Sequence, residues 1–172
     1  MKKLRLLILS TLLILLFGLL PSTTQNVVAD NHSQLDSLKH TENFSSRGLV
    51  HIFLGEINKR GEVVGYHYEG FETETRVIES TRSKTDSNGI YRAKVTLNGK
   101  EKKAFSTFFP KDWKPKKVIK AINEAYKNRE QINDNLYEGV YTEGILNKKR
   151  ITIQMYLDKN DKIITAFPLY KR

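Results

Sequence analysis

The stretch HIFLGEINKRGEVVGYH, residues 51–67, decides how this chain is interpreted. Two apolar runs, Leu49–Leu54 and Val63–Tyr68, flank a turn-forming NKRG segment, which predicts two strands joined in a hairpin. Whether His51 and His67 then share one face depends on the pairing register, because a slip of one residue moves a side chain to the other face. The stretch therefore predicts a β-rich fold that carries a pair of histidines.

Outward from this stretch, the chain continues as short apolar or β-branched runs separated by turn residues. One segment, 115–127, differs: its apolar residues have helical spacing, lysines occupy the other face, and Pro115 suits a first helical turn. We expect an α+β fold with mostly antiparallel, twisted sheets and this one main helix packed on them. The further strands are expected at Arg76–Glu79, Ile90–Leu97, Lys102–Phe109, Arg150–Leu157 and Lys162–Phe167.

The first 29 residues have the features of a cleavable signal peptide. Basic residues precede the apolar run Leu6–Leu20, and small residues ending at Ala29 offer a cleavage site. The run is short for a membrane span, which needs about 18 or more apolar residues, so we expect cleavage and secretion rather than an uncleaved anchor. After cleavage no stable membrane association is expected.

The remaining residues suffice for one domain, expected over 48–172 after a polar leader over 30–47. The leader permits either a short helix around 33–41 or a flexible segment. The chain has no cysteine, which excludes disulfides, thiolate zinc sites and a cysteine nucleophile.

The charge of the chain favours a polyanionic partner. The net charge is +10, and it falls to +7 without residues 1–29, which hold three basic and no acidic residues. Nucleic acid, an anionic cell-wall polymer or a membrane surface would each suit this charge. Surplus lysines also serve solubility, so charge alone leaves both interpretations open.

A pair of histidines suits proton transfer, because one imidazole can be neutral while the other is protonated near neutral pH. A metal site would need a third ligand, such as Glu56, Glu69 or Glu72, but no zinc-motif spacing is present. A serine–histidine triad lacks its nucleophile-elbow motif. RNA cleavage needs only a base, an acid and a cation, since the substrate 2′-OH is the nucleophile. The lysines of KKAFST, residues 102–107, offer that cation or form a solvated strand edge.

The order of these motifs resembles the EndoU family, and most closely the EndoU nuclease domain at the C-termini of bacterial secreted toxins. HIFLG is followed by GYH, then by KAFSTFFP, the helix and a terminal TAFP, so the likeness covers Gly48 to Pro168. It implies an EndoU-like fold and cleavage of single-stranded RNA 3′ of uridine, leaving a 2′,3′-cyclic phosphate. It implies no required cofactor or metal, although Mn²⁺ stimulates some relatives.

The resemblance also implies roles for individual residues. His67 would be the general base on the 2′-OH, and His51 the acid that protonates the leaving 5′-oxygen. Lys103 would stabilise the charge on phosphate, with Lys102 as the alternative within the lysine doublet. The residues expected to contact the uridine base are Thr107, Ser106, Thr165 and Phe167.

One position departs from the family pattern. Phe167 stands where many relatives have tyrosine before the terminal proline; a phenyl ring still stacks on a base but lacks the hydroxyl, for which Tyr170 is a candidate substitute. This departure sustains a rival hypothesis, a catalytically impaired, basic, secreted module that binds RNA or an anionic polymer. For an active enzyme the expected partners are single-stranded RNA and, if it is a toxin, an acidic immunity protein. The sequence leaves a toxin role and a nutritional role open.

Overall fold

The computed structural model describes residues 33–144 and 149–171, so the expected signal peptide lies outside the described residues. The helices are α3 (Ser46–Phe53), η1 (Glu79–Thr81) and α4 (Pro115–Lys127). The strands are β1 (Glu56–Ile57), β2 (Val63–Val64), β3 (Arg76–Val77), β4 (Tyr91–Ala93), β5 (Val95–Leu97), β6 (Lys100–Glu101), β7 (Ser106–Phe108), β8 (Glu130–Asn133), β9 (Leu136–Glu143), β10 (Lys149–Leu157) and β11 (Ile163–Pro168).

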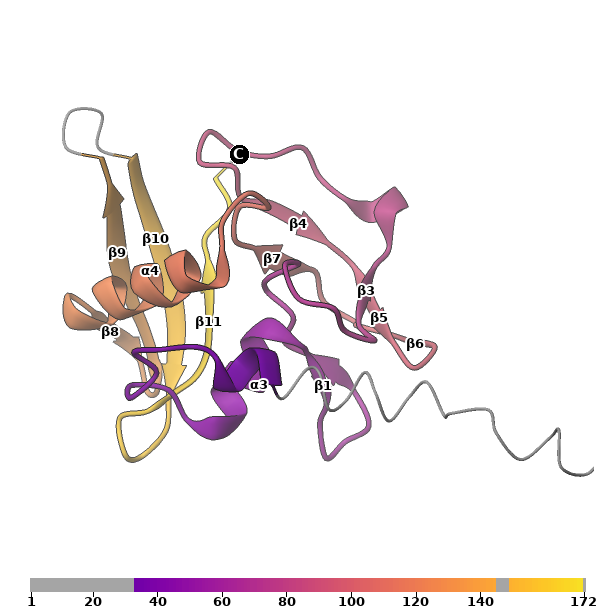
Figure 1. Cartoon of the computed structure of the whole chain (residues 1–172), viewed down its shortest axis with the longest axis horizontal. Helices are drawn as coiled ribbons and strands as arrows, with labels where there is room; N and C mark the ends of the chain where they lie inside the picture. Colours follow the sequence, from indigo (N-terminus) through magenta and orange to yellow (C-terminus); the bar gives the residue numbers. More distant parts are fainter. Residues whose placement is uncertain (1–32, 145–148, 172) are drawn as a thin grey trace, which may run out of the picture.

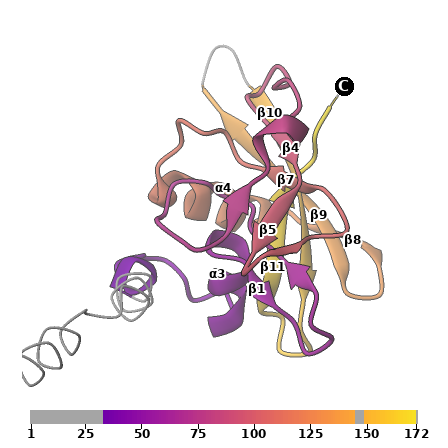
Figure 2. The ribbon, with the colours of Figure 1, turned by 90° about the vertical axis from the view of Figure 1, so that its right-hand side faces the viewer.

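The architecture is α+β with antiparallel sheets, as predicted (Figure 1). Four strands form the largest sheet, in the order β11-β10-β9-β8, and α4 lies across it. The smaller sheets are β1-β2, β4-β7 and β3-β5-β6. Figure 1 shows β3 to β7 together on one side of the molecule and the four-stranded sheet with α4 on the other; in Figure 2, seen from the right-hand side of Figure 1, β4, β5 and β7 overlap the sheet. Among the described residues no helix is long and apolar enough to cross a membrane.

The larger core lies between α4 and the four-stranded sheet. Helix α4 begins at Pro115, as the sequence predicts, and buries the apolar face that contains Val118 and Ile122. Gly139 on β9 permits close packing, because a Cβ there would lie 1.9 Å from a backbone oxygen of α4. Residues 33–36, within the range considered for a short helix, are helical, and Leu35 of the polar leader is buried in this core.

A smaller core lies between the short strands. The rings of Tyr91 on β4 and Phe108 on β7 stack with centroids 4.9 Å apart, and Tyr66 packs edge-on against Phe108 at 5.7 Å. These aromatic contacts hold β4 and β7 against the segment that follows β2. Strand β11 contacts both α3, which belongs to the larger core, and β7, which belongs to the smaller one.

The predicted strand Leu49–Leu54 is wrong, because these residues belong to α3 and its C-terminal cap. The hydroxyl of Ser45 accepts a hydrogen bond from the N–H of Gly48 at 2.9 Å and caps the helix start. Gly55, with φ +73°, ends the helix, and its N–H donates to the carbonyl of Val50. A short, continuously apolar run cannot be assigned to helix or strand by periodicity alone, so these caps were the only local signals.

Other predicted strands are present but shorter. Val63–Tyr68 reduces to β2, because Gly65 and Tyr66 have φ values of +76° and +62° and leave the extended conformation. Ile90–Leu97 is divided at Lys94 into β4 and β5. The polar strand β8, whose residues are all exposed, and its partner β9 were not predicted.

Candidate active site

His51 and His67 lie next to each other, with ring centroids 6.2 Å apart. They are not paired across a hairpin: His51 is in the last turn of α3 and His67 is in the segment after β2. The N–H of Tyr66 donates to the carbonyl of His51 at 2.8 Å, and that of His67 donates to Ile52 at 2.7 Å. The last carbonyls of a helix have no partner inside it, so this segment satisfies them and brings both histidines together.

Gly65 makes this approach possible. A Cβ at this position would lie 2.1 Å from the carbonyl oxygen of His51, and the φ of Gly65 is in the left-handed region that favours glycine. The glycine of the GYH motif is therefore required by the contact between the segment and α3.

His67 is held as a neutral base. Its Nδ1 lies 2.8 Å from the carbonyl oxygen of Thr107, which can only accept, so Nδ1 carries the hydrogen and Nε2 keeps its lone pair. Burial, followed by the positive charges of Lys102 and His51, holds the pKa of His67 well below its usual value. The side chain is therefore suited to accept a proton at Nε2.

His51 has a different environment. Its Nδ1 lies 3.2 Å from Oε1 of Glu56, and the other carboxylate oxygen, Oε2, accepts a hydrogen bond from Arg47 at 2.6 Å. Burial lowers the pKa of His51, while the hydrogen bond and negative charge of Glu56 act in the opposite direction. A carboxylate beside Nδ1 stabilises the imidazolium form, so Nε2 of His51 is suited to donate a proton.

Lys102, rather than Lys103, extends toward the histidines. Its ammonium group donates to the carbonyl of Gly65 at 2.9 Å and to the hydroxyl of Ser106 at 2.7 Å. Burial lowers the pKa of Lys102 to about 8. The side chain of Lys103 is 82% exposed and pairs with Glu62 at 2.5 Å. Of the two lysines considered from the sequence, the structure brings the alternative into the site.

The expected base-contacting residues divide into two groups. The hydroxyl of Ser106 is fully buried and donates to Gly65 while accepting from Lys102, so it holds the lysine in place. Thr107 holds His67 through its backbone, and its half-buried side chain lies on the other face of β7 from Ser106.

The other two come from β11 and meet the site from the larger sheet. The ring of Phe167 stacks on His67 with centroids 5.1 Å apart and an interplanar angle of 25°. The hydroxyl of Thr165 is buried and has no hydrogen-bond partner among the described residues. A buried hydroxyl without a partner is costly. Thr165 lies two residues before Phe167, so the two side chains share one face of β11.

Two residues of the site, Glu56 and Arg47, were not predicted for this role. From the sequence, Glu56 was a candidate only for a metal ligand, whereas the structure places it beside His51 and Arg47. Within residues 33–144 and 149–171, no group of three or more His, Asp or Glu could hold a metal ion.

A separate hollow of about 950 Å³ runs along α4 and is lined by lysines and carboxylates, including Lys120 and Glu124. None of the residues discussed above as parts of the histidine site lines it. The hollow is therefore distinct from the histidine pair.

Comparisons with known proteins identify the family of this chain. The family model of the bacterial EndoU nuclease matches residues 45–170, which include both histidines, the lysine doublet and β11. A curated relative from Bacillus cereus, named Toxin, is 45% identical over 154 residues, covering 83% of this chain and 27% of its own length. This chain thus spans about a quarter of that relative. No solved structure is detectably similar. The chain belongs to the bacterial EndoU nuclease family.

Proposed function

We propose that this nuclease cleaves single-stranded RNA by acid–base transesterification. The observation that carries the proposal is the unequal environment of two adjacent histidines. His67 has a carbonyl partner and a strongly lowered pKa, whereas His51 has a carboxylate partner that favours its protonated form. One base and one acid at a single site are what strand cleavage by a 2′-OH requires.

In this mechanism Nε2 of His67 removes the proton from the 2′-OH. The 2′-oxygen attacks the adjacent phosphorus while the bond from phosphorus to the 5′-oxygen breaks. Nε2 of His51 gives its proton to the departing oxygen. The products are a 2′,3′-cyclic phosphate and a 5′-hydroxyl end, and the enzyme is left with His67 protonated and His51 neutral.

Lys102 would stabilise the negative charge that develops on the non-bridging phosphate oxygens. Its charge influences both histidines, and its ammonium is held by two neutral oxygen acceptors rather than by a carboxylate. With a pKa of about 8 it is mostly protonated at and below neutral pH. A positive charge in a partly dry site is worth more to the transition state than one in water.

Uridine preference would come from β11. We assign the hydrogen bond to the uracil edge to Thr165, because its buried hydroxyl has no other partner among the described residues. The phenyl ring of Phe167 would stack on the base or hold His67 against it, neither of which needs the missing hydroxyl. Ser106 is already fully engaged with Lys102 and Gly65, so its role is to position the lysine.

The biological setting is part of the proposal. The N-terminal segment 1–29 supports secretion, and the name of the Bacillus cereus relative supports a toxin. A basic nuclease toxin would be neutralised by an acidic immunity protein that covers the site.

The test is to incubate the purified protein with end-labelled oligonucleotides that carry a single uridine and to identify the product ends. We expect a 2′,3′-cyclic phosphate and a 5′-hydroxyl, and no cleavage when that uridine lacks its 2′-OH. Parallel reactions with EDTA and with MnCl₂ measure any metal stimulation. Cleavage of the deoxy substrate would exclude the mechanism, and binding without cleavage would favour the impaired binding module.

A further inference from the structure

An exposed aromatic ring lies two residues before Thr107, whose backbone contacts His67. Among the described residues, the large hydrophobic side chains that are exposed are Phe105, Ile132 and Ile164, of which only Phe105 is aromatic, and it is 42% exposed. The guanidinium carbon of Arg92 lies 5.2 Å from the centroid of the Phe105 ring. The ammonium of Lys94 lies 5.6 Å from the same centroid. An exposed ring with two cations beside it is a chemically distinct surface.

This surface is on the face of β4-β7 that carries Thr107. Ser106 and Phe108 are buried, so Phe105 and Thr107 alternate with them toward the opposite face. Arg92 is the direct cross-strand partner of Thr107 and shares that face. Phe105 is about 7 Å along the strand from Thr107, at roughly 3.3 Å per residue. The backbone carbonyl of Thr107 holds His67, so the ring is two residues along the chain from a direct neighbour of His67.

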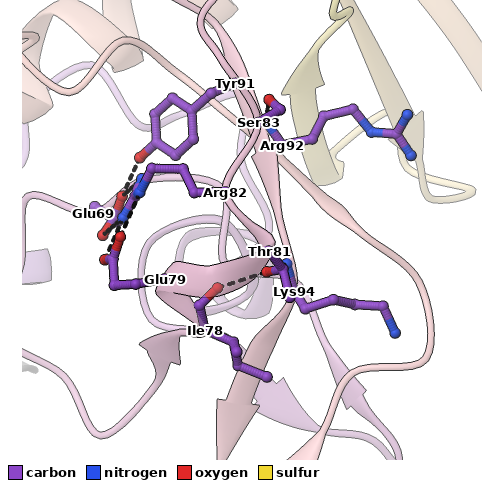
Figure 3. A network of polar contacts seen from close by, with 9 residues as sticks. All are labelled: Glu69, Ile78, Glu79, Thr81, Arg82, Ser83, Tyr91, Arg92 and Lys94. Carbon is purple, nitrogen blue, oxygen red and sulfur yellow. Dashed lines mark hydrogen bonds and ion pairs between the residues drawn. The ribbon is translucent and has the colours of Figure 1, made fainter.

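Arg92 is free to bind an anion, in contrast to its neighbour Arg82 (Figure 3). Arg82 pairs with Glu69 and Glu79 at 2.7 and 2.6 Å. The guanidinium of Arg92 forms no hydrogen bond or ion pair with residues 33–144 or 149–171, and Figure 3 shows it extending away from the Arg82 network. An unpaired guanidinium is a strong phosphate ligand.

Lys94 links this surface to the catalytic lysine. Its ammonium donates to the backbone carbonyls of Lys102 and Lys103 at 3.2 and 2.8 Å and pairs with Glu101. Since its hydrogen bonds are used within the protein, Lys94 positions the segment, and Arg92 remains as the cation available to a ligand.

We propose that Phe105 and Arg92 form a subsite for a nucleotide of the RNA strand beyond the cleaved dinucleotide. The base stacks on the exposed part of the Phe105 ring, and the adjoining phosphate contacts the guanidinium of Arg92. Aromatic rings combined with cations bind single strands with little sequence preference, because every base has a flat face. The inference rests on the proposed RNA cleavage and extends it to the length of strand that the enzyme binds.

The kinetic test compares a uridine-containing dinucleotide with a longer oligonucleotide that has one ribouridine among 2′-deoxynucleotides. For Phe105→Ala we expect KM for the longer substrate to rise about tenfold while kcat for that substrate stays unchanged. The values of kcat and KM for the dinucleotide should also stay unchanged. Arg92→Gln should raise the same KM and make it less dependent on salt. Phe105→Trp should restore binding. Ile132→Ala and Arg150→Gln, at exposed positions on other strands, are the matched controls.

A binding test separates this inference from the proposed chemistry. The longer oligonucleotide with 2′-deoxyuridine cannot react, and its affinity for the full chain is measured by fluorescence anisotropy. Weaker binding by Phe105→Ala supports the subsite even if no RNA is cut, in which case only the proposed chemistry fails. Normal cleavage with unchanged affinity and KM overturns the subsite alone. If Phe105→Ala lowers cleavage of the dinucleotide and of the longer oligonucleotide equally, Phe105 only supports the segment that carries Lys102. That result also overturns the subsite.

Discussion

The two histidines are the same residue type in two unlike regions. His51 lies in the last turn of a capped helix, beside the ion pair of Glu56 and Arg47. His67 lies in a buried segment, against the carbonyl of Thr107. Both pKa values are lowered mainly by burial, but only His51 has a carboxylate that opposes the shift. Neighbouring groups, rather than the imidazole itself, thus give the two histidines different tendencies to hold a proton.

The largest expected effect is the loss of either histidine. We expect His67→Ala and His51→Ala each to lower kcat/KM by roughly 10²- to 10⁴-fold, the usual contribution of a positioned acid or base. In pH–rate profiles His67→Ala should remove the acidic limb, and His51→Ala should remove the alkaline limb. His40→Ala, at an exposed histidine, is the control. Near-normal cleavage by either site variant would contradict the acid–base pair.

The lysine doublet gives the next largest effect. Lys102→Gln should lower kcat by about 10²- to 10³-fold, as expected for removal of a charge-stabilising group. Lys103→Gln should have an effect within about twofold, since the ammonium of Lys103 is exposed and paired with Glu62. Single-turnover cleavage of the uridine oligonucleotide measures both. The reverse ranking would assign the catalytic charge to Lys103.

A smaller effect is expected from the carboxylate that distinguishes the two regions. Glu56 raises the pKa of His51, so Glu56→Gln should lower that pKa further. At a given pH a smaller fraction of His51 is then protonated, so the alkaline limb of kcat/KM moves to lower pH. Activity near pH 7 should drop several-fold, while the acidic limb, set by His67, stays in place. A shift of the acidic limb instead would exchange the assigned roles.

The smallest effect concerns stability. In the unfolded chain a histidine binds a proton near pH 6.5, whereas folded His67 does so only at lower pH. The unfolded chain therefore binds more protons as pH falls below 6.5, and the free energy of unfolding decreases by up to about 1.4 kcal/mol per pH unit for this group. Urea denaturation from pH 7 downward measures the slope. His67→Gln should flatten it, and an unchanged slope would mean that His67 is not the group responsible.

Some of the fold was predictable because its signals are local. Pro115 and the helical spacing that follows predict α4 at the bounds observed. The sequence of α3 is more ambiguous, because its apolar run is short and is interrupted only by His51, and only Ser45 and Gly55 mark its ends. Strand β8 is polar and exposed, so no apolar alternation marks it. Such elements form through tertiary pairing, which no local pattern contains.

The candidate site was predictable in its parts and not in its assembly. The motifs identified His51, His67 and the lysine doublet, but which lysine enters the site depends on burial in three dimensions. Likewise Glu56 becomes the partner of His51 only because Gly55 terminates α3 and the chain reverses beside it. The family resemblance therefore predicted which residues form the site, whereas the structure shows which groups contact each of them.

The backbone hydrogen bonds between α3 and the segment after Gly65 have a consequence for how this family could vary. They hold His51 and His67 together directly, so the intervening β1-β2 hairpin does not set the separation of the two histidines. Residues inserted at the turn after Asn58 would lengthen the β1-β2 hairpin and leave both imidazoles in place. The hairpin tip is thus a natural point for insertions or for grafting a foreign recognition loop next to an unaltered catalytic pair.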